Sequence, residues 1–218
     1  MNVAVLGTGV VGQTLATKLV SVGHAVTMGS RQAGNDKAAV WAASAGDLAS
    51  EGSFADAASS AALVVNATAG MASIDALTAA GAQNLAGKVL LDVANALDFS
   101  GGMPPTLDPC NTDSLGERIQ RTFPEARVVK SLNTVNCDVM VNPAIAGGSH
   151  TMFVAGNDDD AKGEVRGLLE SFGWPPDDIL DLGDIGAARG LEMYIPLWLR
   201  LWGATGTGHL NVKVVREA

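Results

Sequence analysis

A glycine-rich segment near the N-terminus constrains the fold of this chain more than any other feature. Gly7-Thr8-Gly9-Val10-Val11-Gly12 has the spacing G-x-G-x-x-G, and it directly follows the aliphatic run Asn2–Leu6. A segment with helical periodicity extends from about Gln13 to Val22, and a second aliphatic run occupies 25–28. This order predicts a βαβ unit whose helix begins at the glycines.

Each glycine of the motif has a physical role in such a unit. Gly7 permits a tight turn, Gly9 lets a pyrophosphate approach the backbone, and Gly12 lets the helix pack closely on the strand. The helix N-terminus presents free N–H groups and a positive dipole end to phosphate. We therefore predict that residues 7–12 bind the pyrophosphate of a dinucleotide. The alternative interpretation is a turn that only needs small residues.

The end of the second strand indicates which dinucleotide binds. NAD-binding domains usually place Asp or Glu there, where it accepts hydrogen bonds from the ribose 2′-OH. This chain has Gly29-Ser30-Arg31 instead, and its next acid is Asp36. Ser30 and Arg31 can donate hydrogen bonds to a 2′-phosphate. Thr8 and Lys37 could add contacts. We predict NADP(H) as the cofactor; the alternative is a solvent-facing arginine.

Strands and helices alternate along the rest of the chain. Strands are predicted at 63–66, 88–92, 127–130, 152–155 and 179–182, and helices at 37–44, 54–60, 74–80, 112–123 and 158–171, the fourth capped by Thr112 or Asp113. A long loop rich in Gly and Pro spans 96–111. The pattern predicts an α/β fold, a Rossmann-type, doubly wound and mostly parallel sheet over residues 1–183, with a small C-terminal helical cap over 184–218.

Three further strand ends should face the same crevice, because ligands bind at the carboxyl ends of parallel strands. They are Asn66-Ala67-Thr68, Val93-Ala94-Asn95 and Leu132-Asn133-Thr134-Val135. Their small groups suit a ribose and a nicotinamide, so the cofactor contacts that we expect there are Asn66, Ala67, Thr68, Ala94 and Asn95. Ordinary turn chemistry is the alternative for each residue. Lys130, near a strand end, is interpreted as a surface lysine.

The C-terminal segment differs in character from the rest. Ala187–Trp202 reads as a helix that is apolar nearly all round, and such a helix must be buried on several sides. Gly206 and Gly208 would let backbone pass close to a ligand, and residues 210–214 alternate as in a short strand. We expect this segment to wall off the site of the second substrate. The alternative is a structural or dimerising helix.

Composition narrows the function classes. A formal net charge of −9 argues against nucleic-acid binding. The two cysteines, Cys110 and Cys137, form neither a disulfide framework nor a zinc motif, and the three histidines lack metal-ligand spacing. No signal peptide or long apolar span is evident, so we expect a cytoplasmic protein with free thiols, without metal and without membrane association. No acid–base motif identifies a catalytic residue. Hydride transfer between two tightly held rings needs none.

At these residues the chain resembles the NADP-dependent reductases of the deazaflavin coenzyme F420. The matching stretches are 3–9, 26–31, 128–135 and 180–214. The resemblance implies that Thr8, Ser30 and Arg31 hold the 2′-phosphate of NADP. It also implies that the protein is a homodimer. The residues that it implies shape the deazaflavin cavity, together with the C-terminal helix, are Asn133, Thr134, Val135, Gly206 and Gly208.

The predicted function is therefore hydride transfer between NADP(H) and a small-molecule acceptor, coenzyme F420. One alternative is an NADPH-dependent reductase of another flavin, a carbonyl or an imine. A second, from a different class, is a non-catalytic NADPH-binding sensor. Turnover of a deazaflavin separates the first two, and binding of NADPH without its oxidation by any acceptor favours the third.

Overall fold

The computed structural model describes residues 1–217 and contains an eight-stranded sheet with the order β10-β9-β8-β5-β4-β1-β2-β3. Its strands are β1 (Asn2–Leu6), β2 (Ala25–Ser30), β3 (Ala49–Ser53), β4 (Leu63–Asn66), β5 (Val89–Asp92), β8 (Arg127–Ser131), β9 (Met152–Gly156) and β10 (Ile179–Asp181). Neighbouring strands are parallel except β8 and β9, which are antiparallel. The Rossmann-type, mostly parallel sheet is confirmed.

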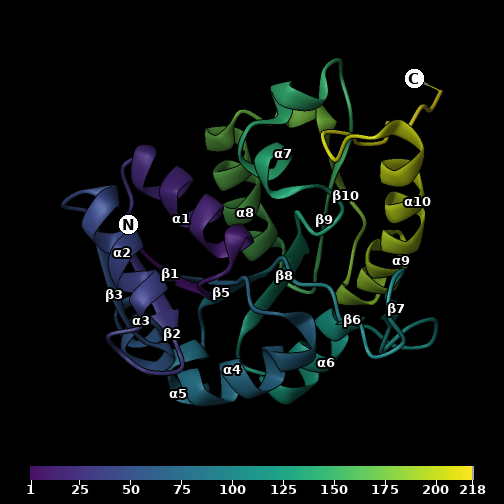
Figure 1. Cartoon of the computed structure of the whole chain (residues 1–218). Helices are drawn as coiled ribbons and strands as arrows, with labels where there is room; N and C mark the ends of the chain where they lie inside the picture. The colour runs from purple at the N-terminus through teal and green to yellow at the C-terminus, as the bar shows by residue number, and fades with distance from the viewer. Residues whose placement is uncertain (218) are drawn as a thin grey trace.

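Helices cover both faces of the sheet (Figure 1). They are α1 (Val10–Ser21), α2 (Asp36–Ala45), α3 (Phe54–Ser60), α4 (Ser73–Ala80), α5 (Ala82–Leu85), α6 (Leu115–Thr122), α7 (Cys137–Val141), α8 (Asp159–Phe172), α9 (Ala188–Met193) and α10 (Ile195–Thr205), with 3-10 turns at Gly70–Ala72, Pro143–Ala146, Pro176–Asp178 and Ile185–Ala187. One hydrophobic core joins the sheet to α1, α2, α7 and α8, and a second joins it to α3, α4, α5 and α6. Strands buried on both faces explain the continuous aliphatic runs in the sequence.

Two features of the sheet region were not predicted. β3 has the sequence Ala-Ser-Glu-Gly-Ser and pairs only with β2, so this edge strand carries no aliphatic run. The loop 96–111 contains an antiparallel hairpin of β6 (Leu97–Asp98) and β7 (Thr106–Leu107), which is too short to give a periodic pattern. The expected cap of α6 at Thr112 or Asp113 is wrong, because Ser114 is the cap and accepts from the Glu117 N–H.

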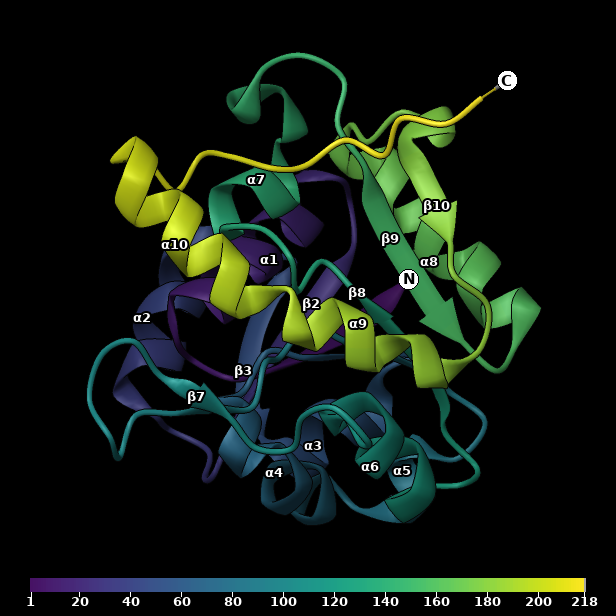
Figure 2. The same ribbon diagram turned by 90° about the vertical axis from the view of Figure 1, so that its right-hand side faces the viewer.

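The C-terminal helix is interrupted at Tyr194, so the single helix expected over 187–202 is two helices. Pro196 in the first turn of α10 has no N–H to donate, which breaks the hydrogen-bond ladder. Figure 2 shows α9 and α10 crossing in front of the sheet, with β7 below them and the C-terminal tail running past α7. The strand expected at 210–214 is wrong. Thr151 binds this extended tail instead, through its N–H to Val212 O and its Oγ1 to the Val214 N–H.

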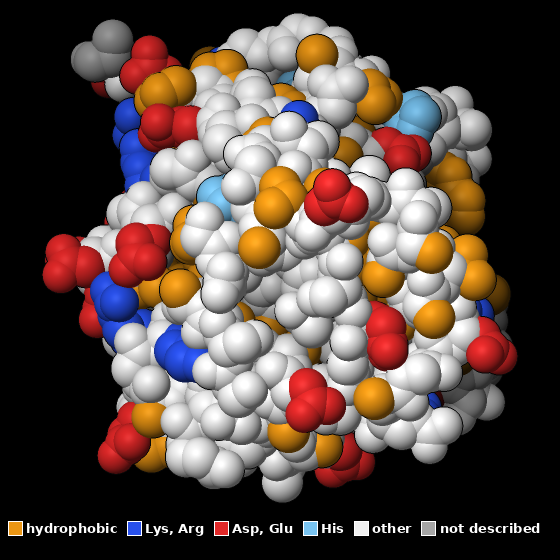
Figure 3. All heavy atoms as spheres, turned by 90° about the vertical axis from the view of Figure 1, so that its left-hand side faces the viewer, with side chains coloured by type: hydrophobic (Ala, Val, Ile, Leu, Met, Phe, Trp, Pro, Cys, Tyr) orange, Lys and Arg blue, Asp and Glu red, His pale blue; other side chains and the backbone are white. Residues whose placement is uncertain are grey.

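Apolar side chains are exposed on more than one face of the molecule. Figure 3 shows the face opposite α9 and α10, where hydrophobic side chains lie scattered among polar and charged ones. On α10, Leu197 is 54% exposed and Trp202 is 44% exposed. Within residues 1–217, no helix has the length and apolar character needed to cross a membrane.

Candidate active site

The loop between β1 and α1 has the backbone that the glycine motif predicts. Gly7 has φ +126°, and a Cβ there would overlap the carbonyl oxygen of Ala67. A Cβ on Gly12 would overlap the carbonyl oxygen of Gly7, so only glycine lets the helix approach this turn. Gly9 caps α1, and a Cβ there would meet nothing within 4 Å. The N-terminus of α1 is therefore open to a ligand at Gly9, as a phosphate site requires.

The end of β2 presents Ser30 and Arg31 differently. The Ser30 side chain is buried and its Oγ donates to the carbonyl oxygen of Gln32 at 2.5 Å, whereas Arg31 is exposed. The Glu51 carboxylate accepts the Gly34 N–H at 3.0 and 3.1 Å, which fixes the loop that follows Arg31. The guanidinium of Arg31 is therefore accessible to a 2′-phosphate. The Ser30 hydroxyl already donates to Gln32, so it would have to rotate away from that acceptor to donate to a 2′-phosphate.

The remaining two candidates for this phosphate are accessible. Thr8 is half-buried, and its carbonyl oxygen accepts from Gln13 Nε2 at 3.0 Å. Lys37 is exposed in the first turn of α2. Both stay predictions.

A cavity of about 390 Å³ lies where the carboxyl ends of β4, β5 and β8 meet α10. It brings together eight of the predicted site residues: Val10, Val11, Ala67, Thr68, Ala94, Asn95, Asn133 and Val135. Val93 of the predicted strand end and Ile195, Trp198 and Leu199 of the predicted C-terminal helix also line it. The sequence did not indicate the other lining residues: Ala69, Gly70, Leu97, Phe99, Asn136, Cys137 and Met140. None of these described lining residues is Asp, Glu, Lys, Arg or His. The cavity wall is therefore electrically neutral.

Asn66 lies beneath this cavity rather than in its wall. Its side chain is fully buried, and its Nδ2 donates to Ser73 Oγ at 3.0 Å and to Asp92 Oδ1 at 2.8 Å. Its Oδ1 accepts from Thr68 Oγ1 at 2.7 Å. With every polar atom of Asn66 paired inside the protein, its role in this structure is to orient Thr68. Thr134 is likewise buried and is not a lining residue.

Lys130 is not a surface lysine, and that interpretation is wrong. Its side chain is 0% exposed, and Nζ lies 2.7 Å from Asp92 Oδ2 and 2.8 Å from Glu192 Oε1. Nζ also donates to the carbonyl oxygen of Ala94 at 2.5 Å. Burial alone would lower the pKa of Lys130, but attraction to the two carboxylates outweighs burial and raises it. Lys130 is a charged ammonium that holds the strand end carrying Ala94.

Glu192 extends this buried network into the C-terminal segment. Its carboxylate accepts the N–H groups of Leu115 at 2.8 Å and Gly116 at 3.0 Å, at the N-terminus of α6. Arg189, one turn earlier, forms an ion pair with Glu117 of α6. The segment from 184 onward is thus bonded into the Rossmann domain, and the domain boundary at residue 183 stays a prediction.

The two glycines of the C-terminal tail, Gly206 and Gly208, have different structural roles. Gly206 has φ +71° as the C-cap of α10, and a Cβ there would meet nothing within 4 Å, so its conformation ends a helix. A Cβ on Gly208 would lie 3.2 Å from Asn136 Nδ2 and 3.7 Å from the Trp198 ring, both in the cavity wall. Of the two, only Gly208 packs against the cavity wall.

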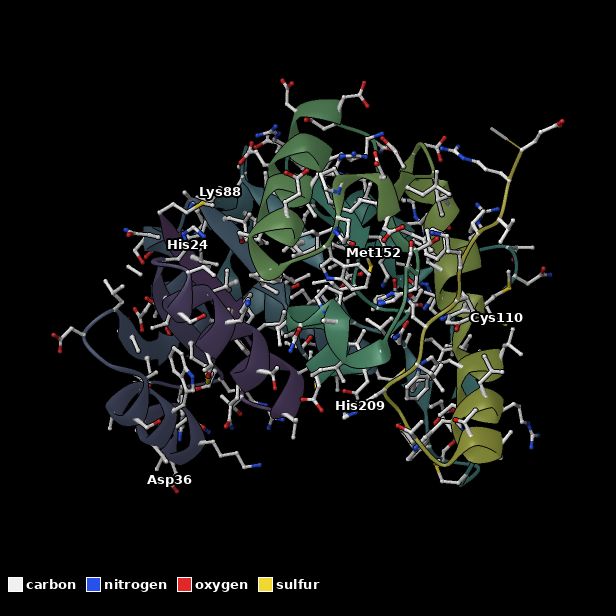
Figure 4. The ribbon with its side chains drawn as sticks, turned by 90° about the horizontal axis from the view of Figure 1, so that it is seen from above. His24, Asp36, Lys88, Cys110, Met152 and His209 are labelled. Carbon is white, nitrogen blue, oxygen red and sulfur yellow. The ribbon has the colours of Figure 1, made fainter. Side chains whose placement is uncertain are left out.

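The next residue anchors the tail. His209 lies on the tail beside α7 (Figure 4). Its Nε2 is 3.0 Å from Asp138 Oδ2. Of the free cysteines, Cys110 is exposed and Cys137 is half-buried in the cavity wall.

A family model described as NADP oxidoreductase, coenzyme F420-dependent, matches residues 2–96. A crystal structure from Arthrobacter sp. FB24, described provisionally as an F420-dependent NADP-reductase, is 56% identical with a TM-score of 0.93, over 99% of this chain and 100% of that chain. The chain belongs to this family of NADP oxidoreductases. The expected family is confirmed.

More distant relatives share the fold with other chemistry. The rat metalloreductase STEAP3 is 29% identical over 200 residues, which are 91% of this chain and 37% of that protein. This chain therefore spans little more than a third of that curated relative. A reductive aminase from Aspergillus terreus, solved with NADPH and ethyl levulinate, has a TM-score of 0.67 at 21% identity, over 94% of this chain and 62% of that chain. At that identity the likeness concerns the fold alone.

Proposed function

We propose that this oxidoreductase transfers a hydride between NADP(H) and a deazaflavin of the coenzyme F420 type. The observation that carries the proposal is the neutral cavity at the carboxyl ends of β4, β5 and β8, next to the open N-terminus of α1. A dinucleotide bound at α1 extends along these strand ends in a Rossmann domain. The family description, which names both NADP and coenzyme F420, supports the same pair of substrates.

The residues of the cofactor half would act by binding and orientation. The N–H groups of α1 behind Gly9 would bind the pyrophosphate, and Arg31 would bind the 2′-phosphate with its fork of donors. Thr68, held by Asn66, and Asn95, which donates to the carbonyl oxygen of Asn133 at 2.8 Å, would line the nicotinamide end. When bound, NADPH supplies the hydride.

The neutral cavity wall favours a deazaflavin over a carbonyl or an imine. A carbonyl or an imine needs a proton on its oxygen or nitrogen, which a positioned acid normally delivers. The protic side chains in this wall are amides, the Thr68 hydroxyl, the Cys137 thiol and the Trp198 N–H, and none is a carboxyl, imidazole or ammonium group. A deazaflavin would take the hydride on a ring carbon and spread the charge over its rings, and the proton that completes the reduction could come from solvent. A flat, neutral site without a positioned acid would therefore be sufficient. The residues of the wall would therefore hold two rings in contact and exclude water.

We also propose that the protein is a homodimer. The exposed Leu197 and Trp202 of α10 support this, because large apolar side chains on one exposed helix favour a protein partner. Light scattering after size-exclusion chromatography tests the proposal. A single species with the mass of one chain at all concentrations would contradict it.

A steady-state assay with NADPH and purified coenzyme F420, followed at the absorption bands of both compounds, tests the activity. Equal consumption of the two compounds is expected, with NADH a much poorer donor. FMN and a cyclic imine serve as comparison acceptors. NADPH oxidation by the imine alone would favour an imine reductase. Tight NADPH binding without oxidation by any acceptor would favour a sensor.

A further inference from the structure

The backbone of Ala94, in the cavity wall, is held on both sides by one buried ion pair. The Ala94 N–H donates to Asp92 Oδ1 at 3.2 Å, and its carbonyl oxygen accepts from Lys130 Nζ at 2.5 Å. Nζ lies 2.7 Å from the other carboxylate oxygen of Asp92, and both side chains are 0% exposed. Bulk water therefore cannot replace any of these three contacts.

Asp92 also holds the neighbouring strand end. Its Oδ1 accepts from Asn66 Nδ2 at 2.8 Å, and Asn66 Oδ1 accepts from Thr68 Oγ1 at 2.7 Å. Thr68 lines the cavity, as Ala94 does. Because β4 and β5 are adjacent parallel strands, the ion pair fixes the two loops that follow them in one arrangement.

The same two loops also touch each other directly. A Cβ on Gly70 would lie 2.2 Å from the carbonyl oxygen of Asn95, so the loop after β4 passes very close to the loop after β5. Asn95 in turn exchanges two hydrogen bonds with Asn133, at 2.8 and 3.0 Å. A shift of Ala94 would therefore be passed on to the cavity wall on both sides of it.

The cost of burying these charges indicates a role beyond stability. Lys130 also lies 2.8 Å from Glu192, whose carboxylate accepts the N–H groups of Leu115 and Gly116. Three buried charges are expensive to desolvate, and well-packed apolar side chains often stabilise a fold as well or better. Apolar side chains could not, however, hold both the N–H and the carbonyl oxygen of Ala94. Fixing this backbone is what the charged groups add.

We propose that Lys130 and Asp92 are positioning residues for the nicotinamide half of the cofactor. They are fully buried, so they act through the loops after β4 and β5 and touch no nucleotide. These loops present Thr68, Ala94 and Asn95 to the nicotinamide and its ribose in one geometry. The inference rests on the proposed function for the identity and orientation of the cofactor, in which the α1 N-terminus and Arg31 bind the other half. Loss of the ion pair should therefore affect one half of NADPH and not the other.

Two nucleotides that differ only in the nicotinamide half test the proposal. NADPH and 2′-phospho-ADP-ribose, which lacks the nicotinamide, are titrated by calorimetry into each protein well below its Tm. Lys130→Met is the test variant. Lys162→Met is the matched control, because Lys162 is also largely buried, at 7% exposure, and pairs with Asp159 and Asp181 outside the cavity wall.

We expect Lys130→Met to weaken NADPH binding by roughly 5–20-fold, as when one or two hydrogen bonds to the nicotinamide half are misaligned. Binding of 2′-phospho-ADP-ribose should change by less than about twofold, and Lys162→Met should leave both affinities within about twofold of the wild type. A merely structural role would not separate the two nucleotides. Asp92→Asn, which keeps the shape of the side chain, is the second variant and should show the same separation if Lys130→Met folds poorly.

Three results would overturn the proposal. The first is an equal loss, or no loss, for the two nucleotides in Lys130→Met and Asp92→Asn. The second is the same separation in Lys162→Met, because any lost buried charge would then suffice. The third is equal binding of the two nucleotides by the wild type, because no contact to the nicotinamide half would then exist to be positioned.

These titrations contain no hydride acceptor, so they also separate this inference from the proposed function. If the two nucleotides separate as expected but coenzyme F420 is not reduced, the positioning role stands and the proposed activity fails. If coenzyme F420 is reduced but the nucleotides do not separate, the activity stands and the positioning role fails. If neither nucleotide binds the wild type, both fail.

Discussion

Replacing Lys130 with methionine tests whether the buried charge network holds the C-terminal segment on the Rossmann domain. Methionine is similar in length to lysine but has no charge. In the variant, Asp92 and Glu192 would face each other without the ammonium that lies 2.7 and 2.8 Å from them. All three side chains are at most 2% exposed, so water cannot replace Lys130.

The size of the expected destabilisation follows from the burial of these three side chains. Removing one partner of a buried ion pair destabilises a protein by about 3–5 kcal/mol, because the remaining charge is uncompensated. For a chain of this size, each kcal/mol lowers Tm by roughly 2–4 °C, so we expect a decrease of about 6–20 °C.

Urea unfolding at pH 8 measures the effect, with the exposed Lys37→Met as the matched control. Lys37→Met should change the free energy of unfolding by less than about 0.5 kcal/mol. A Lys130→Met variant as stable as the wild type at pH 8 would refute the argument that the three groups form a charged, mutually dependent network.

Four further predictions concern the site and the Arg189–Glu117 ion pair. Arg31→Ala should weaken NADPH binding by roughly 1.5–3 kcal/mol and leave NADH binding nearly unchanged in calorimetry; equal losses would exclude the 2′-phosphate role. Gly9→Val should abolish NADPH binding while far-UV circular dichroism stays native, and retained binding would mean that phosphate binds elsewhere. Val135→Trp should raise KM for the acceptor or abolish turnover with NADPH affinity within about threefold, roughly 0.65 kcal/mol; unchanged acceptor kinetics would argue against the cavity. The hydrogen bonds from Arg189 lower the pKa of Glu117. The pair therefore stabilises the fold fully above the unfolded-state pKa of this carboxyl, and the stabilisation is lost as pH falls through its lowered folded-state pKa. Glu117→Gln should therefore flatten the acid limb of the stability curve, and an unchanged limb would contradict this.

The central strands could be predicted because local sequence and tertiary burial agree there. β1, β4 and β5 are buried on both faces and read as unbroken aliphatic runs, and the glycine motif fixes the first turn. The edge strand β3 and the hairpin β6–β7 lack such a pattern, because few of their residues face a core. Periodicity reports burial, so it misses elements that are held mainly by backbone hydrogen bonds.

The charge network could not be predicted from spacing, because its members come from distant parts of the chain. One signal was nevertheless present in the sequence. Lys130 stands inside the run Arg-Val-Val-Lys-Ser, whose last four residues are buried in a central strand. A charged residue at such a position must be paired, since an isolated buried ammonium is strongly unfavourable. This reasoning predicts that partners exist, but only the fold identifies Asp92 and Glu192.

For the apolar C-terminal helix, too, the sequence indicates that residues should be buried but does not identify what buries them. Its sequence predicts burial on several sides, but within the described chain only Ile195 of α10 is buried. Trp198 and Leu199 face the cavity, whereas Leu197 and Trp202 are exposed. Hydrophobic periodicity measures how much apolar surface a helix must cover and not which surfaces cover it. The cavity face is accounted for by the proposed acceptor, and the outer face is what the proposed homodimer would bury. If the protein proves monomeric, the acceptor site can stand, but the outer face of α10 then needs a different partner.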